Sequence, residues 1–263
     1  MFYIGVFIVK EFVRWLLSEE NSKITIELFD RWHFMYWFII FGGTILLSIL
    51  YCNKSDKAKD KIIRLFAYLT IGIYISDFFL MPLSDSYGFS IGIDDLPFHI
   101  CTIMATMVPF VQFSDKFKRI KTVIVTLSVT SSLMWMAYPG SALGEPPFSY
   151  VILSKFLFHG VLFCWGVLNL SLGAVHLQFK KIWHEFCAIL IILAWSSLGN
   201  AIYDNQNWFF IKDSIFDFLP DKIMPPVVVF CVFGSCFLVY CGYYAIQALA
   251  SKRHRQPLKL KNA

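Results

Sequence analysis

The chain has 263 residues, of which 57% are hydrophobic and 16% are charged, and its formal net charge at pH 7 is +5. Its mean hydropathy is +0.62. A soluble domain has about 45–50% apolar and about 25% charged residues, so this composition excludes an ordinary soluble globular protein. The length fits one compact helical bundle in a membrane rather than two domains.

The first stretch, residues 2–17, is apolar but is interrupted by Lys10, Glu11 and Arg14. It lacks a small-residue cleavage pattern, so it does not resemble a signal peptide. We expect it to be a helix lying in the outer membrane interface, within an N-terminal interfacial segment at residues 1–32. The alternative is an eighth, short membrane span.

A membrane-spanning helix needs about 20 mostly apolar residues. Seven stretches meet this requirement and predict an all-α, polytopic bundle of seven transmembrane helices over residues 33–250. They are 33–52, 63–83, 96–113, 122–139, 150–175, 182–203 and 226–249. After the sixth stretch, Trp208, Phe209 and Phe210 are typical of an interfacial aromatic anchor.

Basic residues are concentrated in the loops after the first, third and fifth stretches and in the tail, residues 251–263. The positive-inside rule then predicts a multi-pass plasma-membrane protein with its N-terminus outside and its C-terminus in the cytoplasm. Because these bases lie in short loops beside apolar spans, they indicate orientation in a membrane rather than nucleic-acid binding. We expect the basic tail to contact anionic lipid headgroups.

The chain has seven cysteines, an odd number, and no CxxC pair. This pattern argues against a disulfide framework and against a thiolate zinc site. We therefore expect no metal and no other cofactor, and we expect most cysteines to pack as small hydrophobic side chains.

Ionisable and polar groups inside a span are costly, so they mark either a functional site or a packing device. This chain has five such candidates: Asp77, His99, Cys101, His159 and Asn200. At about 1.5 Å per residue, all five fall in the outer half of the bilayer, although they come from four different stretches. We therefore predict that they share one layer of the bundle.

The segment 96–101 begins the third stretch. Pro97 suits the first turn of a helix, which an aspartate at 94 or 95 could cap. On such a helix His99 and Cys101 would point about 200° apart, so only one of them could face the centre of the bundle. They are therefore not expected to act as a pair.

Cys101 needs a base from another helix, and His159 is the best placed by depth. A Cys–His pair is the minimal equipment for acyl transfer, in which the thiol accepts an acyl group as a thioester and passes it on. Other interpretations remain open. The histidines could be structural hydrogen-bond partners, Cys101 could be packing, and Asn200 could bond between helices.

Two further functions also remain open. Asp77, His99 and His159 could be the titratable groups of a transporter or channel for a small solute or proton, although no inverted repeat is visible. The protein could also be a non-catalytic membrane partner subunit, in which the polar cluster only determines helix packing.

The motif Leu-Pro-Phe-His-Ile-Cys at 96–101 resembles the LPLHLC-type signature of YwaF-like integral membrane proteins, whose eukaryotic relative is transmembrane protein 164. Phe-Leu-Phe-His-Gly at 156–160 matches the second histidine of that family. Asn200 and the pair Asn207-Trp208 resemble its Asn…Asn-Tyr stretch, with Trp in place of Tyr. The resemblance covers about residues 55–230, and it implies a seven-helix bundle.

For the eukaryotic member, the resemblance implies an acyltransferase that remodels phospholipid acyl chains through a cysteine. Carried over, it makes Cys101 the nucleophile and His159 its base, while His99 would orient or stabilise the oxyanion. Membrane lipids would then be the partners, with phospholipid acyl chains as substrate. We expect Asp77, Asn200 and Asn207 to provide binding or support around the site.

Overall fold

The computed structural model describes residues 24–80, 96–203, 205–213 and 220–255. In these ranges the chain forms seven α-helices and five short 3₁₀ helices, and no strand. The helices are α2 (Arg31–Cys52), α3 (Asp56–Leu80), α4 (Ile100–Phe113), α5 (Lys121–Ala137), α6 (Tyr150–Ser171), α7 (Trp183–Ile202) and α8 (Met224–Arg255). The predicted all-α fold is confirmed, and each predicted stretch corresponds to one helix. The predicted helix at 2–17 lies outside the described residues.

Among the described residues, five helical stretches are long and apolar enough to cross a membrane: Arg31–Cys52, Asp115–Ala137, Ile152–Ser171, Phe179–Ile202 and Asp221–Leu249. The protein is therefore a membrane protein. With 14 residues, α4 is about 21 Å long, which is shorter than a hydrocarbon core of about 30 Å. α3 is longer, but its first turns are charged. The number of complete crossings remains a prediction.

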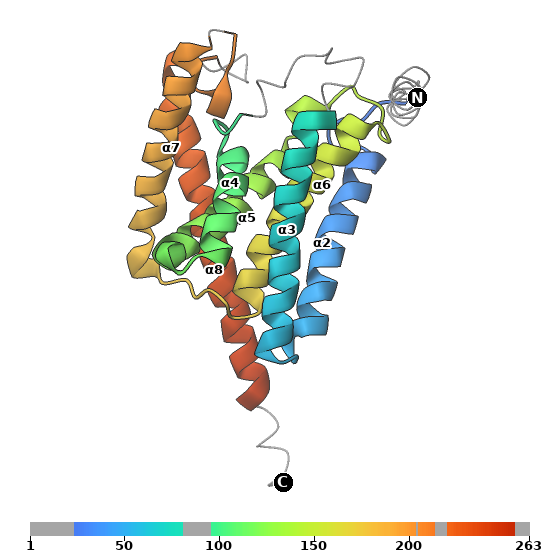
Figure 1. Ribbon diagram of the computed structural model, residues 1–263, viewed down its shortest axis with the longest axis vertical. Helices are drawn as coiled ribbons and strands as arrows, with labels where there is room; N and C mark the ends of the chain where they lie inside the picture. The colour runs from blue at the N-terminus through green and yellow to red at the C-terminus, as the bar shows by residue number, and fades with distance from the viewer. Residues whose placement is uncertain (1–23, 81–95, 204, 214–219, 256–263) are drawn as a thin grey trace, which may run out of the picture.

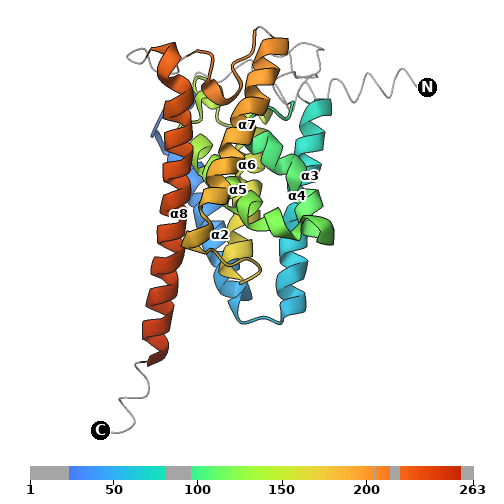
Figure 2. The same cartoon turned by 90° about the vertical axis from the view of Figure 1, so that its left-hand side faces the viewer.

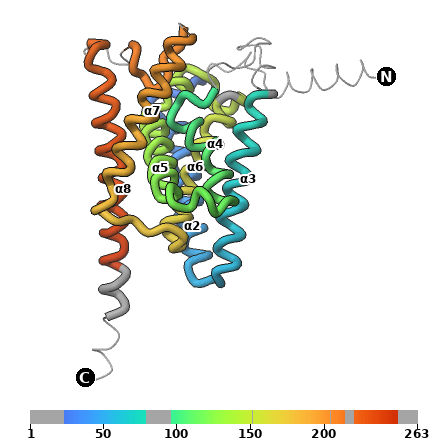
Figure 3. The backbone as a smooth tube through the Cα atoms, turned by 60° about the vertical axis from the view of Figure 1, so that its left-hand side comes forward, coloured from blue at the N-terminus to red at the C-terminus, as the bar shows by residue number. Residues whose placement is uncertain are grey.

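Helix α5 lies at the centre of the bundle (Figures 1 and 2). α3 contacts α4, α4 contacts α5, α5 contacts α6, and α6 contacts α3, so these four helices form a closed unit with α4 and α6 on one diagonal. α2 packs outside this unit on α6, while α7 and α8 pack on α5 and on each other (Figure 3). Residues from α4 and α6 can therefore meet only in the centre of the four-helix unit.

The close crossing of α5 and α6 depends on small residues. A Cβ atom at Gly166 would lie 2.6 Å from Val129 Cγ2 and 3.2 Å from the Val125 carbonyl oxygen, so only glycine fits there. α5 itself carries a run of buried hydroxyl side chains: Thr126, Ser128, Thr130, Ser131 and Ser132. Small and hydroxyl-bearing residues let helices approach closely in a membrane.

The residues before α2 also pack on the bundle. The Ile26 N–H donates to the Glu145 carbonyl at 2.9 Å, and the Ile26 carbonyl accepts from the Gly144 N–H at 2.9 Å. Ile26 is fully buried. His33 is buried too, and its Nε2 lies 2.7 Å from the Met136 carbonyl. This histidine therefore joins α2 to the end of α5, and residues 24–32 belong structurally with the bundle.

Candidate functional site

The helix that carries Cys101 begins later than predicted. It starts at Ile100, and His99 is its N-cap residue with extended backbone angles (φ −82°, ψ 149°). Pro97 lies outside the helix, in a tight turn in which the Phe98 N–H donates to the Leu96 carbonyl at 2.7 Å. The prediction of Pro97 in the first helical turn is therefore wrong. The predicted angle of about 200° between the His99 and Cys101 side chains is wrong as well, because it assumed that both residues lie within the helix.

Side chains of α7 explain the later start of α4. Trp195 Nε1–H donates to the Pro97 carbonyl at 2.8 Å, and the Ser196 hydroxyl donates to the Phe98 carbonyl at 2.5 Å. In a longer α4 these two carbonyls would accept intrahelical hydrogen bonds instead. The tertiary contacts therefore replace the first helical turn.

Phe98 is held on three sides. Its ring stacks on Trp195 with centroids 5.2 Å apart, and it lies 4.6 Å from the ring of Trp208. On the third side is Gly199, where a Cβ atom would lie only 2.5 Å from the Phe98 ring. This packing places the residues that precede Cys101 between α7 and the 3₁₀ turn η6 (Trp208–Phe210).

Asn200 holds η6 through its backbone. Its Oδ1 accepts from the Trp208 N–H at 2.8 Å, and its Nδ2 donates to the Trp208 carbonyl at 3.0 Å. The sequence suggested that Asn200 bonds to another membrane helix, whereas its side chain bonds to the backbone of the loop that follows its own helix. The next two residues, Phe209 and Phe210, have positive φ angles of 62° and 52°. Such angles are rare for residues other than glycine and occur where the surroundings stabilise them.

The interpretation of the three aromatic residues as an interfacial anchor is wrong for two of them. Trp208 is 0% exposed and Phe209 is 3% exposed, and only Phe210 is exposed. Asn207 shapes the same loop, because its Oδ1 accepts from the Lys212 N–H at 2.9 Å and its Nδ2 donates to the Asp213 carbonyl at 2.8 Å. The asparagines at 200 and 207 thus organise the loop that covers His99.

The contacts of His99 determine which ring nitrogen carries its proton. The Phe209 N–H donates to His99 Nδ1 at 3.3 Å, and the His99 ring lies 5.6 Å from that of Phe210. Because Nδ1 accepts a hydrogen bond, the neutral imidazole carries its proton on Nε2. His99 therefore presents a hydrogen-bond donor at Nε2.

His159 has the opposite arrangement. Its Nδ1 lies 2.8 Å from the Lys155 carbonyl, and a carbonyl can only accept, so the neutral ring carries its proton on Nδ1. Its Nε2 is then a proton acceptor, and it is buried with no hydrogen-bond partner among the described residues. The ring stacks on Trp135 with centroids 3.9 Å apart and an interplanar angle of 4°.

Asp77 belongs to a different group. Its Oδ1 accepts from the Ser154 hydroxyl at 2.7 Å and from the Tyr150 hydroxyl at 3.1 Å, which ties α3 to α6. Within the described residues it makes no hydrogen bond to either His99 or His159.

Cys101 is partly buried and packs against the main hydrophobic core. It is the second residue of α4 after the His99 N-cap. The partial positive charge at the N-terminus of a helix favours an anion such as a thiolate. Among the described residues, no group of three or more His, Cys, Asp or Glu is placed to hold a metal ion.

Sequence reasoning missed Glu185, a second buried carboxyl group. It is 1% exposed, and its Oε1 accepts from the Tyr240 hydroxyl at 2.7 Å. It lies near the start of the predicted stretch 182–203, close to Lys180–Lys181, where a charged residue is ordinary, so its burial was not predicted. The only signal was the run of hydroxyl residues in α5, which indicates a polar packing seam. Trp135, which stacks on His159, was missed for lack of any local pattern.

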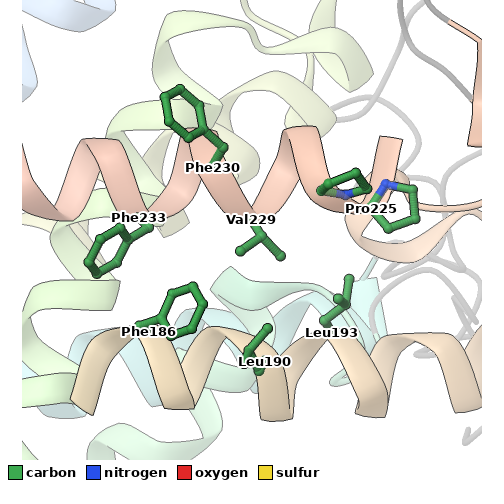
Figure 4. A pocket seen from close by; sticks show the side chains of 8 residues that line it. Phe186, Leu190, Leu193, Pro225, Val229, Phe230 and Phe233 are labelled. Carbon is green, nitrogen blue, oxygen red and sulfur yellow. The ribbon is translucent and has the colours of Figure 1, made fainter. Parts of the chain in front are cut away.

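An apolar groove of about 440 Å³ lies between α7 and α8. Phe186, Leu190 and Leu193 of α7 face Val229 and Phe233 of α8 across it (Figure 4). Exposed apolar surface of this kind on a membrane protein is covered by lipid acyl chains or by another helix. None of Cys101, His99 and His159 lines this groove.

The model of the TMEM164 family matches residues 28–246, which include α2 to α7 and most of α8. No curated protein matches the chain, and no solved structure matches it. The matched range contains both the 96–101 motif and the 156–160 motif, so the resemblance noted in the sequence is confirmed. With most of its length covered by that family model, this membrane protein belongs to the TMEM164 family.

Proposed function

We propose that the protein is an acyltransferase, or an acyl hydrolase, that acts on membrane lipids through Cys101 and His159. The observation that best supports this proposal is the buried Nε2 of His159, which has no hydrogen-bond partner in the part of the chain that the structure describes. The Nδ1 contact with the Lys155 carbonyl leaves that nitrogen as the proton acceptor. A general base needs this combination of a lone pair and an orientation held by its other nitrogen.

The helix arrangement supports a meeting of the two groups. α4 and α6 occupy one diagonal of the four-helix unit, and Cys101 lies at the end of α4 that is nearest His99. Ile100 of α4 and Phe158 of α6 belong to the same buried hydrophobic cluster, which is consistent with the start of α4 lying near the middle of α6. His99 then supplies an Nε2–H donor at the same place.

The reaction follows from these roles. His159 Nε2 takes the proton of the Cys101 thiol, and the thiolate attacks the carbonyl carbon of a lipid ester. The carbon–oxygen ester bond breaks, the acyl group stays on Sγ as a thioester, and the departing lipid alkoxide takes the proton back from Nε2. A second lipid hydroxyl, or water, then loses its proton to Nε2 and attacks the thioester, which restores the thiol.

His99 would stabilise the oxyanion in both steps. Its Nε2–H would donate to the carbonyl oxygen as negative charge develops there, which is the role of an oxyanion-hole donor. Asn200 and Asn207 would act indirectly, because they hold the loop whose Phe209 N–H orients the His99 ring. Asp77 would support the site by joining α3 to α6 through Ser154, about one and a half turns from His159.

We also propose seven crossings of the plasma membrane, with the N-terminus outside and the C-terminus in the cytoplasm. The loop between α2 and α3 and the end of α8 lie at the same end of the bundle (Figure 1), and the basic residues favour that end on the cytoplasmic side. Labelling of single cysteines placed at residues 54 and 205 with an impermeant maleimide in intact cells tests this. We expect labelling at 205 and not at 54, and the opposite pattern would contradict the proposed orientation.

The test of catalysis uses the full chain in liposomes that contain a phospholipid with a labelled acyl chain and an unlabelled lysophospholipid. Cys101→Ser and His159→Gln should each lower acyl transfer or release by about 10²–10⁴-fold, the contribution of a positioned acid–base group. Wild-type protein should also carry a hydroxylamine-sensitive acyl group on Cys101, detected by mass spectrometry.

Matched controls are Cys187→Ser and His184→Gln, which change exposed residues of α7 and should leave the turnover unchanged. Wild-type turnover in Cys101→Ala would refute nucleophilic catalysis by that thiol. A pH-dependent proton flux in the same liposomes, abolished by Asp77→Asn, would instead establish transport. Full complementation of a deletion strain by the Cys101→Ala, His159→Ala double variant would indicate a non-catalytic partner subunit.

A further inference from the structure

A polar pocket of about 460 Å³ lies at the end of α4 opposite to Cys101. Its walls come from the first turns of α3, the last turn of α4, the 3₁₀ turn η3 (Asp115–Ile120), the start of α5, and residues 174–176 after α6. Figure 2 shows η3 beside the lower part of α3. The chain turns after α6 at Gly173, whose positive φ of 79° favours glycine.

Two carboxylates line the pocket, and both are paired. Arg64 Nε lies 2.6 Å from Asp60 Oδ2, and Lys118 Nζ lies 2.5 Å from Asp115 Oδ1. Each pair is neutral overall, so neither leaves a net charge in the pocket. The charge balance therefore depends on the remaining lysine.

Lys121, the first residue of α5, is that remaining cation. It is half-buried, and its ammonium group makes no ion pair or hydrogen bond within the described part of the chain. Asp60 attracts it, whereas Arg64 and Lys118 repel it. Because Asp60 and Asp115 are each already paired with another cation, the half-buried ammonium group of Lys121 has no carboxylate of its own among the described residues, and burial of such a charge is unfavourable.

Hydrogen-bond donors surround the same space. Gln112 accepts from Trp165 Nε1–H through its Oε1 at 3.3 Å, so its amide NH₂ remains as a donor. The hydroxyl groups of Ser114 and Thr122 line the pocket as well. A tetrahedral oxyanion with several acceptor oxygens matches a lysine surrounded by neutral donors.

We propose that this pocket binds a phosphate group, with Lys121 as its main charge partner. The source of the phosphate is either the headgroup of a phospholipid in the adjacent leaflet or a free phosphate compound, since the recognition chemistry is the same. The pocket shares no residue with the Cys101 and His159 site, so this proposal does not depend on acyl transfer.

The experiment compares wild-type protein with Lys121→Gln, using Lys116→Gln as the matched control. Lys116 is an exposed lysine of the same turn that does not line the pocket. Each protein is placed in nanodiscs of phosphatidylcholine, with or without inorganic phosphate, and in nanodiscs that also contain phosphatidic acid. Thermal unfolding and isothermal titration are measured at constant ionic strength.

We expect the ligand to stabilise wild type and Lys116→Gln, and to bind Lys121→Gln about tenfold more weakly or worse. Stabilisation by inorganic phosphate identifies a free phosphate site, and stabilisation only by phosphatidic acid identifies a headgroup site. Equal losses in Lys116→Gln and Lys121→Gln would overturn the proposal in favour of non-specific attraction. No ligand response in wild type would also overturn it.

A second measurement needs no variant, in case Lys121→Gln does not fold. Wild-type protein is acetylated with an amine-reactive reagent, and the modification of each lysine is followed by mass spectrometry. Ligand should slow the acetylation of Lys121 severalfold and leave Lys116 unchanged. Equal rates at Lys121 with and without phosphate and phosphatidic acid would refute the pocket as a phosphate site.

Discussion

Replacement of Asn200 by alanine removes both side-chain contacts that hold η6. The Trp208 N–H and the Trp208 carbonyl then lose partners at 2.8 Å and 3.0 Å in a region where Trp208 is 0% exposed. An unsatisfied buried backbone group costs about 1–3 kcal/mol, so two of them cost about 2–6 kcal/mol. The better helix propensity of alanine returns about 0.7 kcal/mol. We therefore expect a net loss of about 1–5 kcal/mol.

Asn200→Ala should lower the stability of the η6 turn itself as well as the free energy of unfolding of the whole protein. The positive φ angles of Phe209 and Phe210 are stabilised by the Asn200 contacts, so the turn should relax when those contacts are removed. The assay is unfolding by added SDS in detergent micelles, combined with amide hydrogen exchange. The amides of Trp208 and Phe209 should lose protection in Asn200→Ala, while those of α5 keep it.

The control is Asn205→Ala, which changes an exposed residue in the same loop. It should alter the free energy of unfolding by less than about 0.5 kcal/mol, as surface substitutions usually do. If Asn200→Ala cost as little as Asn205→Ala, with unchanged protection at Trp208, the inference that Asn200 holds η6 would be refuted.

Two further predictions concern the contacts of α6. Gly166→Ala should destabilise the protein by about 1–3 kcal/mol, because its Cβ would lie 2.6 Å from Val129 Cγ2. The control Gly234→Ala should be neutral or stabilising, because a Cβ there meets nothing within 4 Å. Equal effects of the two variants in SDS unfolding would refute the close crossing. Ser154→Ala should destabilise the protein by about 1–3 kcal/mol, because Asp77 then keeps only its Tyr150 contact. A loss below about 0.5 kcal/mol in the same assay would show that this contact contributes little.

The sequence predicted the helices well because their signal is local. Each apolar stretch needs only its own composition to be recognised, and all seven correspond to observed helices. Depth can also be estimated by counting residues along a helix, and the shared layer of the five polar residues stays a prediction. The direction in which a side chain points was not predictable, since it depends on where its helix starts. α4 starts at Ile100 because Trp195 and Ser196, almost 100 residues away, take the carbonyls of Pro97 and Phe98.

The candidate site shows the same division. The residue types and motifs at 96–101 and 156–160 led to the family, and the family match confirmed it. The burial of Trp208, the partners of Asp77 and the presence of Glu185 in the interior came only from the structure. Each of these depends on which helices are neighbours, and a single sequence contains no direct record of that.

Composition and the spacing of apolar residues by themselves determined that this is a helical membrane protein, because the bilayer selects for long apolar helices whatever their order in space. The tertiary structure decided the protonation of the two histidines. Phe209 donates to His99 Nδ1, whereas the Lys155 carbonyl accepts from His159 Nδ1, so one ring offers a donor and the other a base. Hydrogen-bond partners select a tautomer, and folding brings the Phe209 N–H to His99 and buries His159 Nε2 where no other described residue bonds to it.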